Sequence, residues 1–103
     1  KEGKQGKISE DTTERWVSKT VSHYKNGELD GPYEYTAHLH GKLYAYKSGS
    51  YKNGYKHGSW KEIDRDDIAV QGEYTEGRET GHWIRYDIIS GEILNEWSGT
   101  GKI

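Results

Sequence analysis

Apolar and polar positions along this chain alternate at the spacing of β-strands. The segment 68–74 places Ile68, Val70, Gly72 and Tyr74 on one side of an extended chain, which is typical of a strand with one buried face. Segments 16–24 (WVSKTVSHY) and 43–51 (LYAYKSGSY) are rich in β-branched and aromatic residues, and both end on tyrosine, which also predicts strands. No segment keeps a 3.6-residue period long enough for a helix. The pattern therefore predicts an all-β chain.

One ten-residue pattern occurs three times and organises the rest. It reads YKNGELDGPY at 24–33, YKNGYKHGSW at 51–60 and YTEGRETGHW at 74–83. In each copy, glycines follow the first tyrosine by three and seven residues, and an aromatic residue follows it by nine. Recurrence at a period of 20 to 50 residues predicts an array of one supersecondary unit. The residues expected to hold this repeat are Tyr24, Gly27, Gly31, Gly54, Gly58, Tyr74, Gly77 and Gly81.

Glycines in this pattern predict specific backbone features. Asn26-Gly27 and Asn53-Gly54 lie between strands, and Asn-Gly there predicts a type I′ hairpin turn, in which both central residues have positive φ. The second glycine of each copy lacks a side chain, so a neighbouring aromatic ring is expected to lie across its backbone. The same role is expected for Gly49 and Gly72, two residues before a repeat tyrosine.

The strands expected between these turns complete a row of hairpins. Outgoing strands are predicted at 32–37, 59–63 and 82–88, and incoming strands at 43–51, 68–74 and 92–97. Trp60 and Ile63 are three residues apart and fall on opposite faces of a strand, so either both faces are partly covered or a bulge intervenes. Residues 1–7 are expected to be the tail of an upstream copy or a frayed end, and residues 10–14 a loop.

The predicted fold is an elongated, single-layer antiparallel sheet of consecutive β-hairpin repeats. A chain of 103 residues makes one domain at most. We expect one repeat domain over 1–103, with a partial copy at 1–23, repeats at about 24–50, 51–73 and 74–96, and a broken copy at 97–103. Units of this kind are stabilised by stacking on their neighbours.

Composition narrows the classes of partner. The net charge of −2 gives no electrostatic reason to expect nucleic acid. All the aromatic residues are tyrosine or tryptophan, with no phenylalanine, and such rings build surfaces that are half wet. The chain begins with lysine and has no methionine, which is expected of a processed or trimmed protein. We expect a soluble chain, cytoplasmic or exported after removal of a leader.

Candidate chemistry beyond the aromatics is sparse. His38 and His40 can share a strand face, yet a metal site needs further ligands. Asp64, Asp66 and Asp67 cluster in a turn, where aspartate bonds to its own backbone, and Ala69 stands where a helix–loop–helix calcium site needs glycine. There is no cysteine and no Gly-x-Ser-x-Gly nucleophile motif. We therefore expect no metal, no cofactor and no enzymatic activity.

Three segments resemble MORN repeats, and more closely the bacterial variant found in the YwqK-like antitoxin family. These segments are YKNGELDGPYEY (24–35), GSYKNGYKHGSWKEI (49–63) and GEYTEGRETGHWIRY (72–86). Tyr33 departs from this pattern, because tryptophan is usual at its position. The resemblance implies a single-layer β-array with a shallow aromatic groove and no catalytic residues. It also implies protein attachment, toxin neutralisation or phospholipid binding.

Two functions of different classes remain open. One is a protein-binding module, such as an antitoxin or immunity protein, whose partner is a toxin or a scaffold protein. The other is a membrane-associated scaffold that binds anionic phospholipids weakly through scattered lysines. Sheet edges also allow edge-to-edge self-association. Tryptophan and tyrosine dominate interface hot spots, so the expected partner-binding residues are aromatic: Tyr51, Trp60 and Trp83 at the centre, with Tyr35, Tyr44, Tyr46 and Tyr86 flanking them.

Overall fold

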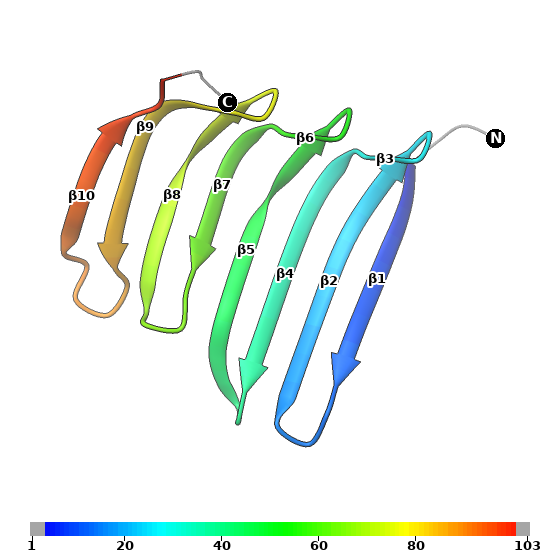
Figure 1. Ribbon diagram of the computed structural model, residues 1–103, viewed down its shortest axis with the longest axis horizontal. Helices are drawn as coiled ribbons and strands as arrows, with labels where there is room; N and C mark the ends of the chain where they lie inside the picture. Colours follow the sequence, from blue (N-terminus) through cyan, green and yellow to red (C-terminus); the bar gives the residue numbers. More distant parts are fainter. Residues whose placement is uncertain (1–3, 101–103) are drawn as a thin grey trace.

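A computed structural model, which describes residues 4–100, shows one open antiparallel sheet (Figure 1). Its hydrogen-bonded order is β1-β2-β4-β5-β7-β8-β9-β10, with β3 paired to β2 and β6 paired to β5. The strands are β1 (Lys4–Thr12), β2 (Trp16–Lys25), β3 (Glu28–Leu29), β4 (Gly31–Leu39), β5 (Lys42–Lys52), β6 (Tyr55–Lys56), β7 (Gly58–Ile63), β8 (Ile68–Thr75), β9 (Arg78–Asp87) and β10 (Ile93–Ser98). No helix occurs in this range, and the prediction of an all-β array of hairpins is confirmed.

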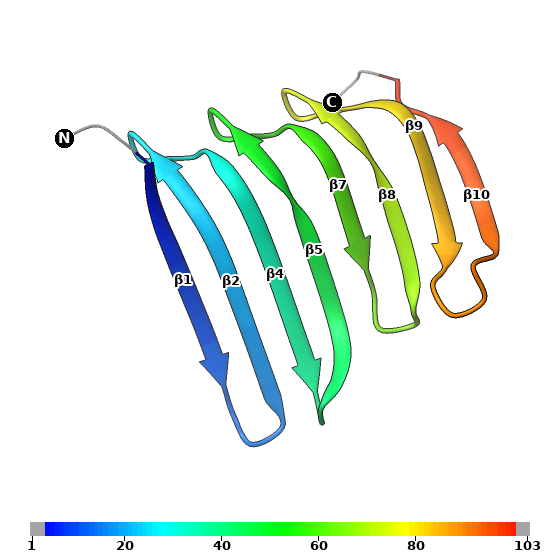
Figure 2. The same ribbon diagram turned by 180° about the vertical axis from the view of Figure 1, so that it is seen from behind.

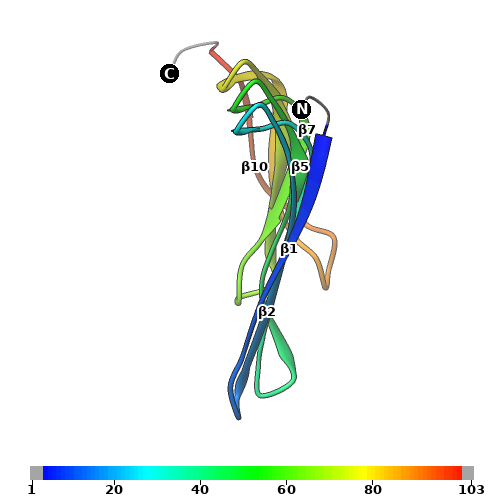
Figure 3. The same ribbon diagram turned by 90° about the vertical axis from the view of Figure 1, so that its right-hand side faces the viewer.

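The sheet is a single layer. Both broad views show the strands side by side in chain order, with no other described segment crossing either face (Figures 1 and 2). Viewed from the side, it is one thin, twisted layer (Figure 3), with extents of 48 × 42 × 17 Å. The sheet has no second sheet or helix to pack against within the described residues. Any side chain buried in it must therefore be covered by other residues of the same sheet.

Each repeat opens with the predicted type I′ turn. The φ angles are 52° and 80° at Asn26-Gly27, 52° and 85° at Asn53-Gly54, and 50° and 83° at Glu76-Gly77. Positive φ at both central residues matches the right-handed twist of the flanking strands. Glutamate is less suited to this conformation than asparagine, so the third turn holds a more strained residue.

Neighbouring turns are joined by backbone hydrogen bonds. The N–H of Gly54 donates to the carbonyl oxygen of Leu29 at 2.8 Å, and the N–H of Gly77 donates to that of Lys56 at 2.9 Å. Leu29 and Lys56 both lie five residues after a repeat tyrosine. Each turn therefore rests on the outgoing chain of the preceding unit, which couples successive repeats.

A bulge recurs at the second glycine of every unit. On β5, Gly49 and Ser50 lie between the pairs Ser48↔Lys61 and Tyr51↔Lys56, so they oppose the longer segment 57–60. The registers of β2 with β3 and β4, and of β8 with β9, shift at the equivalent place. The second glycines Gly31, Gly58 and Gly81 have φ of 112°, 83° and 70°. This conformation, which glycine adopts readily, lets the outgoing chain form the bulge.

Aromatic rings lie on glycines of the incoming strands. A Cβ atom added to Gly49 would overlap the indole ring of Trp60, and one added to Gly72 would overlap that of Trp83. The expected role of Gly49 and Gly72 is confirmed. The same expectation for the second glycines is wrong at Gly58 and Gly81: a Cβ at Gly58 meets nothing within 4 Å, and one at Gly81 meets Glu73. Those glycines serve the bulge instead.

This contact accounts for the two large buried side chains. Trp60 and Trp83 are 3% and 4% exposed, and the other buried apolar residues are Ala37 and Ala69. In the first unit, Ser22 stands at the glycine position and Tyr33 at the tryptophan position. Ser22 is itself buried. In this unit, a residue larger than glycine is therefore combined with a ring smaller than that of tryptophan.

The N-terminal part differs from the sequence prediction. Residues 10–12, expected in a loop, belong to β1, which pairs with β2 from Lys4↔Lys25 to Thr12↔Val17. Residues 4–7, expected to be a tail or frayed end, are in the same strand, while residues 1–3 lie outside the described range. Ile8 is the one large apolar residue of β1 and is itself exposed, so the strand carries no apolar alternation. Backbone pairing with β2 forms the strand instead.

We predict that Gly49→Ala destabilises the fold severely. The added methyl group would displace the Trp60 ring from the strand, and overpacking of this kind costs about 2–3 kcal/mol. Urea unfolding followed by tryptophan fluorescence measures the loss. Gly6→Ala is the matched control, because a Cβ there meets only His23 at 3.5 Å on the edge strand β1. Equal midpoints for the two variants would contradict the packing role of Gly49.

The first unit suggests a pair of substitutions that should compensate for each other at Gly49 and Trp60. Because Ser22 and Tyr33 replace glycine and tryptophan there, Gly49→Ser combined with Trp60→Tyr should lose less stability than the two single losses added together. A double-mutant cycle measures this coupling directly. Strict additivity would show that the ring and the glycine do not act as a pair.

Candidate functional site

Cross-strand pairing places the repeat aromatics on one face of the sheet. Directly opposed residues share a face, and the pairs Tyr33↔Gly49, Trp60↔Gly72 and Trp83↔Trp97 connect the outgoing strands to their neighbours. We define the aromatic face by the residues that these registers bring together: Tyr24, Tyr33, Tyr35, Tyr51, Trp60, Tyr74, Trp83 and Trp97. The opposite side is the reverse face.

Rings on the aromatic face form a continuous row. Consecutive ring centroids are 5.4 Å apart for Tyr33–Tyr51, 5.2 Å for Tyr51–Trp60, 6.2 Å for Trp60–Tyr74 and 5.2 Å for Tyr74–Trp83. These four contacts are edge-to-face, and the row ends with Trp83 stacked on Trp97 at 6.0 Å. Both geometries favour aromatic pairs beyond their buried area, so the row is held rigid by its own contacts.

Hydrogen bonds fix the two buried indoles. Trp60 donates Nε1–H to the carbonyl oxygen of Ser50 at 2.9 Å, and Trp83 donates Nε1–H to that of Thr80 at 3.0 Å. Both groups are thereby satisfied, as buried donors must be. Trp60 and Trp83 therefore form the floor of the aromatic face. Half-buried tyrosines and Trp97 form its accessible part.

The seven aromatics expected to bind a partner do not come together. Tyr35, Tyr51, Trp60 and Trp83 lie on the aromatic face. Tyr46 pairs with Thr36 and Tyr86 pairs with Ala69 on the reverse face, where their hydroxyls donate to Glu34 (3.3 Å) and Gln71 (3.0 Å). Strand alternation separates Tyr46 from Tyr51, because an interval of five residues reverses the face.

Tyr44 lies apart from the row, at the far end of β5. It is the extra residue where the β4–β5 register shifts between Ala37 and His38. Its ring contacts Trp16 at 5.3 Å, and the guanidinium of Arg65 lies 5.9 Å from its centroid. This cluster is a second aromatic group rather than a continuation of the first.

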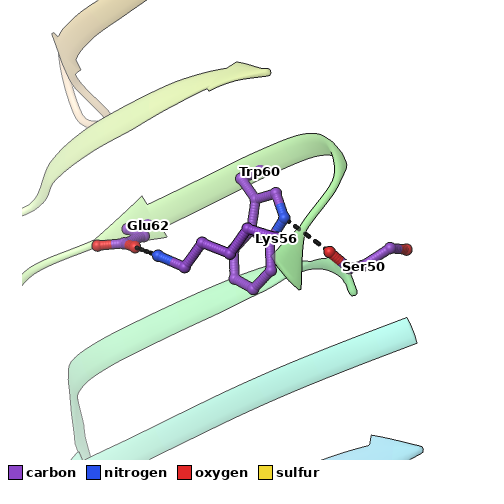
Figure 4. A network of polar contacts seen from close by, with 4 residues as sticks. All are labelled: Ser50, Lys56, Trp60 and Glu62. Carbon is purple, nitrogen blue, oxygen red and sulfur yellow. Dashed lines mark hydrogen bonds and ion pairs between the residues drawn. The ribbon is translucent and has the colours of Figure 1, made fainter. Parts of the chain in front are cut away.

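A lysine seated against the rings was not expected from the sequence. The Nζ of Lys56 lies 4.8 Å from the Trp60 centroid and 3.6 Å from Glu62 Oε2 (Figure 4). It also lies 5.1 Å from the Tyr74 centroid. A cation over aromatic rings is attracted by their quadrupole. Hairpin geometry is the sequence feature that could have placed this lysine near the rings. The residue five after a repeat tyrosine pairs with that tyrosine across the turn, as Lys56 pairs with Tyr51.

Burial changes the acidity of three repeat tyrosines. It raises the pKa of the Tyr33, Tyr51 and Tyr74 hydroxyls above their ordinary value, because a phenolate would lose hydration. The carboxylate of Glu62 also raises the pKa of all three. The row therefore presents neutral hydroxyls.

The remaining polar clusters have structural roles. Asp64 Oδ1 accepts hydrogen bonds from the backbone N–H groups of Asp66 and Ile68 at 2.9 and 3.2 Å, the turn role expected for it. His38 is in β4 and His40 is in a turn with φ of 54°. Over the described range, no group of three or more His, Cys, Asp or Glu side chains is placed to hold a metal. Nor does that range contain a helix long and apolar enough to cross a membrane.

Comparisons with family models, curated proteins and solved structures find no match to this chain. The resemblance to MORN repeats therefore stays a prediction. The functional proposal has to start from the geometry of the aromatic face.

We predict that stability falls as the pH rises through about 10, the ordinary tyrosine value. There the unfolded chain ionises tyrosines that the fold keeps neutral, so the unfolded state binds fewer protons and the free energy of unfolding decreases with pH. Below that pH this contribution is fully present. Urea midpoints at pH 8, 10 and 11 measure the effect, and Tyr74→Phe should reduce its slope. An unchanged slope would contradict the assignment.

Proposed function

We propose that this chain is a non-enzymatic protein-binding repeat module whose binding surface is the aromatic face. The observation that carries the proposal is the row of rings from Tyr33 to Trp97, whose tyrosines and Trp97 stay half-exposed on a sheet that no other described segment covers. Apolar strips that stay open to solvent mark interaction sites. Tyrosine and tryptophan are the side chains most used for such contacts.

Rigidity of the row supports this role. Interlocked rings and hydrogen-bonded indoles hold their positions before a partner arrives. Binding then orders few side chains, and the entropy cost of association is small. Tyrosines also combine an apolar ring with a hydroxyl, so a partner gains both contact area and hydrogen bonds.

The reverse face is less suited to the same task. Tyr46 and Tyr86 on that face already use their hydroxyls on Glu34 and Gln71. His82 and Glu96, which are 2.9 Å apart, form a further pair there. These polar groups would have to be desolvated by a partner, which costs free energy unless each is paired again.

The partner class follows from the sequence resemblance rather than from the face itself. The YwqK-like resemblance implies a toxin as the protein bound, so the chain would act as an antitoxin or immunity protein. The phospholipid alternative is supported less well. Lys52 and Arg78 lie with Glu76 around one hollow at the turns, and mixed charge weakens attraction to anionic lipid.

Face-selective cross-linking tests the proposal. A photo-reactive phenylalanine analogue replaces Tyr35 on the aromatic face or Tyr46 on the reverse face. Both positions are half-buried, on the adjacent strands β4 and β5, so they form a matched pair. We expect a cross-link to a toxin encoded beside this chain, or to another host protein, from position 35 alone. Equal products from both positions, or from position 46 alone, would overturn the choice of face.

A salt series tests the phospholipid alternative. Binding to anionic vesicles should be weak at low salt and lost at ~150 mM, where the Debye length is about 8 Å. Co-sedimentation with phosphatidylserine vesicles measures it, and phosphatidylcholine vesicles are the control. Tight binding that resists salt would replace the protein-binding proposal with the membrane one.

A further inference from the structure

A pocket on the aromatic face combines rings with carboxylates. It encloses about 200 Å³ and is lined by Trp60, Glu62, Val70, Tyr74, Glu79, Trp83 and Trp97. Four of the lining side chains are aromatic and two are acidic. Among residues 4–100, no lysine or arginine forms an ion pair with Glu79, whose Oε1 accepts a long hydrogen bond from Trp97 Nε1 at 3.4 Å.

One side of this pocket shows what such a surface can hold. The ammonium group of Lys56 lies over Trp60 and beside Glu62 (Figure 4), and it also lies over Tyr74. Aromatic faces together with a carboxylate attract ammonium groups through the ring quadrupole and through charge. The chain's own lysine thus occupies the part of this surface beside Glu62.

Residues at one repeat position account for the difference between units. The residue five after each repeat tyrosine faces it across the hairpin, in the pairs Tyr24↔Leu29, Tyr51↔Lys56 and Tyr74↔Glu79. The three units therefore place an apolar, a basic and an acidic side chain at the same point of the aromatic face. Where the second unit supplies its own cation, the third supplies a carboxylate.

We propose that the pocket beside Glu79 binds the ammonium group of a lysine side chain on a protein partner. Trp83 and Trp97 would contact the alkyl chain and the cation, because the Lys56 ammonium already lies over Trp60 and Tyr74, and Glu79 would pair with the charge. Glu62 contributes less, since Lys56 already lies 3.6 Å from it. Charge complementarity favours a cation over a neutral or acidic side chain, and the position of Lys56 shows that an ammonium group fits against such rings.

This inference rests on the proposed function, because it names the chemistry by which a protein partner would be held. It adds a specific requirement to that function. A partner segment that docks on the aromatic face should carry a lysine opposite the third unit, and loss of that charge should weaken binding.

Titration with a small probe tests the site in the full chain. The probe is N-acetyl-lysine N-methylamide, and N-acetyl-norleucine N-methylamide is the neutral control of nearly the same length. Indole N–H signals in ¹H–¹⁵N correlation spectra report on the four tryptophans. We expect the lysine probe to shift the signals of Trp83 and Trp97 at millimolar concentration. Trp16, which packs on Tyr44 away from the pocket, should not move.

Substitutions at Glu79 give the decisive comparison. Glu79→Gln should raise the dissociation constant about three- to fivefold, as expected for the loss of one partly exposed ion pair. Glu79→Lys should abolish binding, because its own ammonium would lie against Trp83 and Trp97 as that of Lys56 lies against Trp60 and Tyr74. Glu73→Gln is the matched control, since Glu73 is exposed and pairs with Ser59 and Thr80 on the reverse face. It should bind like the unsubstituted chain.

Several outcomes would overturn the proposal. One is an equal response to the norleucine probe, and another is undiminished binding by Glu79→Gln, which remains a valid test if Glu79→Lys fails to fold. A shift of Trp97 with phosphatidylcholine vesicles but not with the lysine probe would assign the pocket to a lipid head group. Failure of the probe together with cross-linking from position 35 would remove the lysine site alone. Lysine binding without that cross-link would count against the wider function.

Discussion

The contact between an indole ring and a glycine backbone is what a one-layer sheet of this kind depends on. A sheet normally buries one face against a second layer, and the described part of this chain has none. Because Gly49 and Gly72 have no side chain, the Trp60 and Trp83 rings can lie against the neighbouring strand, where they are almost fully buried. The core is therefore built into the surface of the sheet, one ring for each unit.

Other repeated features follow from that contact. The bulge at the second glycine adds residues to the outgoing chain immediately before the ring, and bulges redirect side chains. Turns then stack on the preceding unit through Gly54 and Gly77. Each indole contacts aromatic rings on both neighbouring incoming strands: Trp60 lies between Tyr51 and Tyr74, and Trp83 lies between Tyr74 and Trp97. Each unit is thus stabilised by contacts with its neighbours and not by one common core, as in other linear repeats.

How far the sequence predicted this structure depends on what each feature requires. Type I′ turns were predictable, because Asn-Gly specifies them locally, and the role of Gly49 and Gly72 followed from their fixed distance to the repeat tyrosines. The edge strand β1 was not, because its pairing with β2 uses backbone groups that any sequence carries. The division of Tyr46 and Tyr51 between two faces was available from alternation alone. The contact between Lys56 and the Trp60 ring was harder to predict. Hairpin geometry places Lys56 opposite Tyr51, but its position relative to Trp60 depends on the register shift that the bulge creates.

The position opposite each repeat tyrosine is where this architecture can vary its chemistry at low cost. The glycines of turn, bulge and ring contact are constrained by φ or by space, so exchange there disturbs the fold. Leu29, Lys56 and Glu79 share one backbone position with none of these constraints, and they differ in charge. A half-exposed side chain beside an aromatic row changes what the row attracts while the backbone stays the same. Specificity in such an array can therefore be set unit by unit, with the rings providing the contact area and one neighbouring side chain providing the charge.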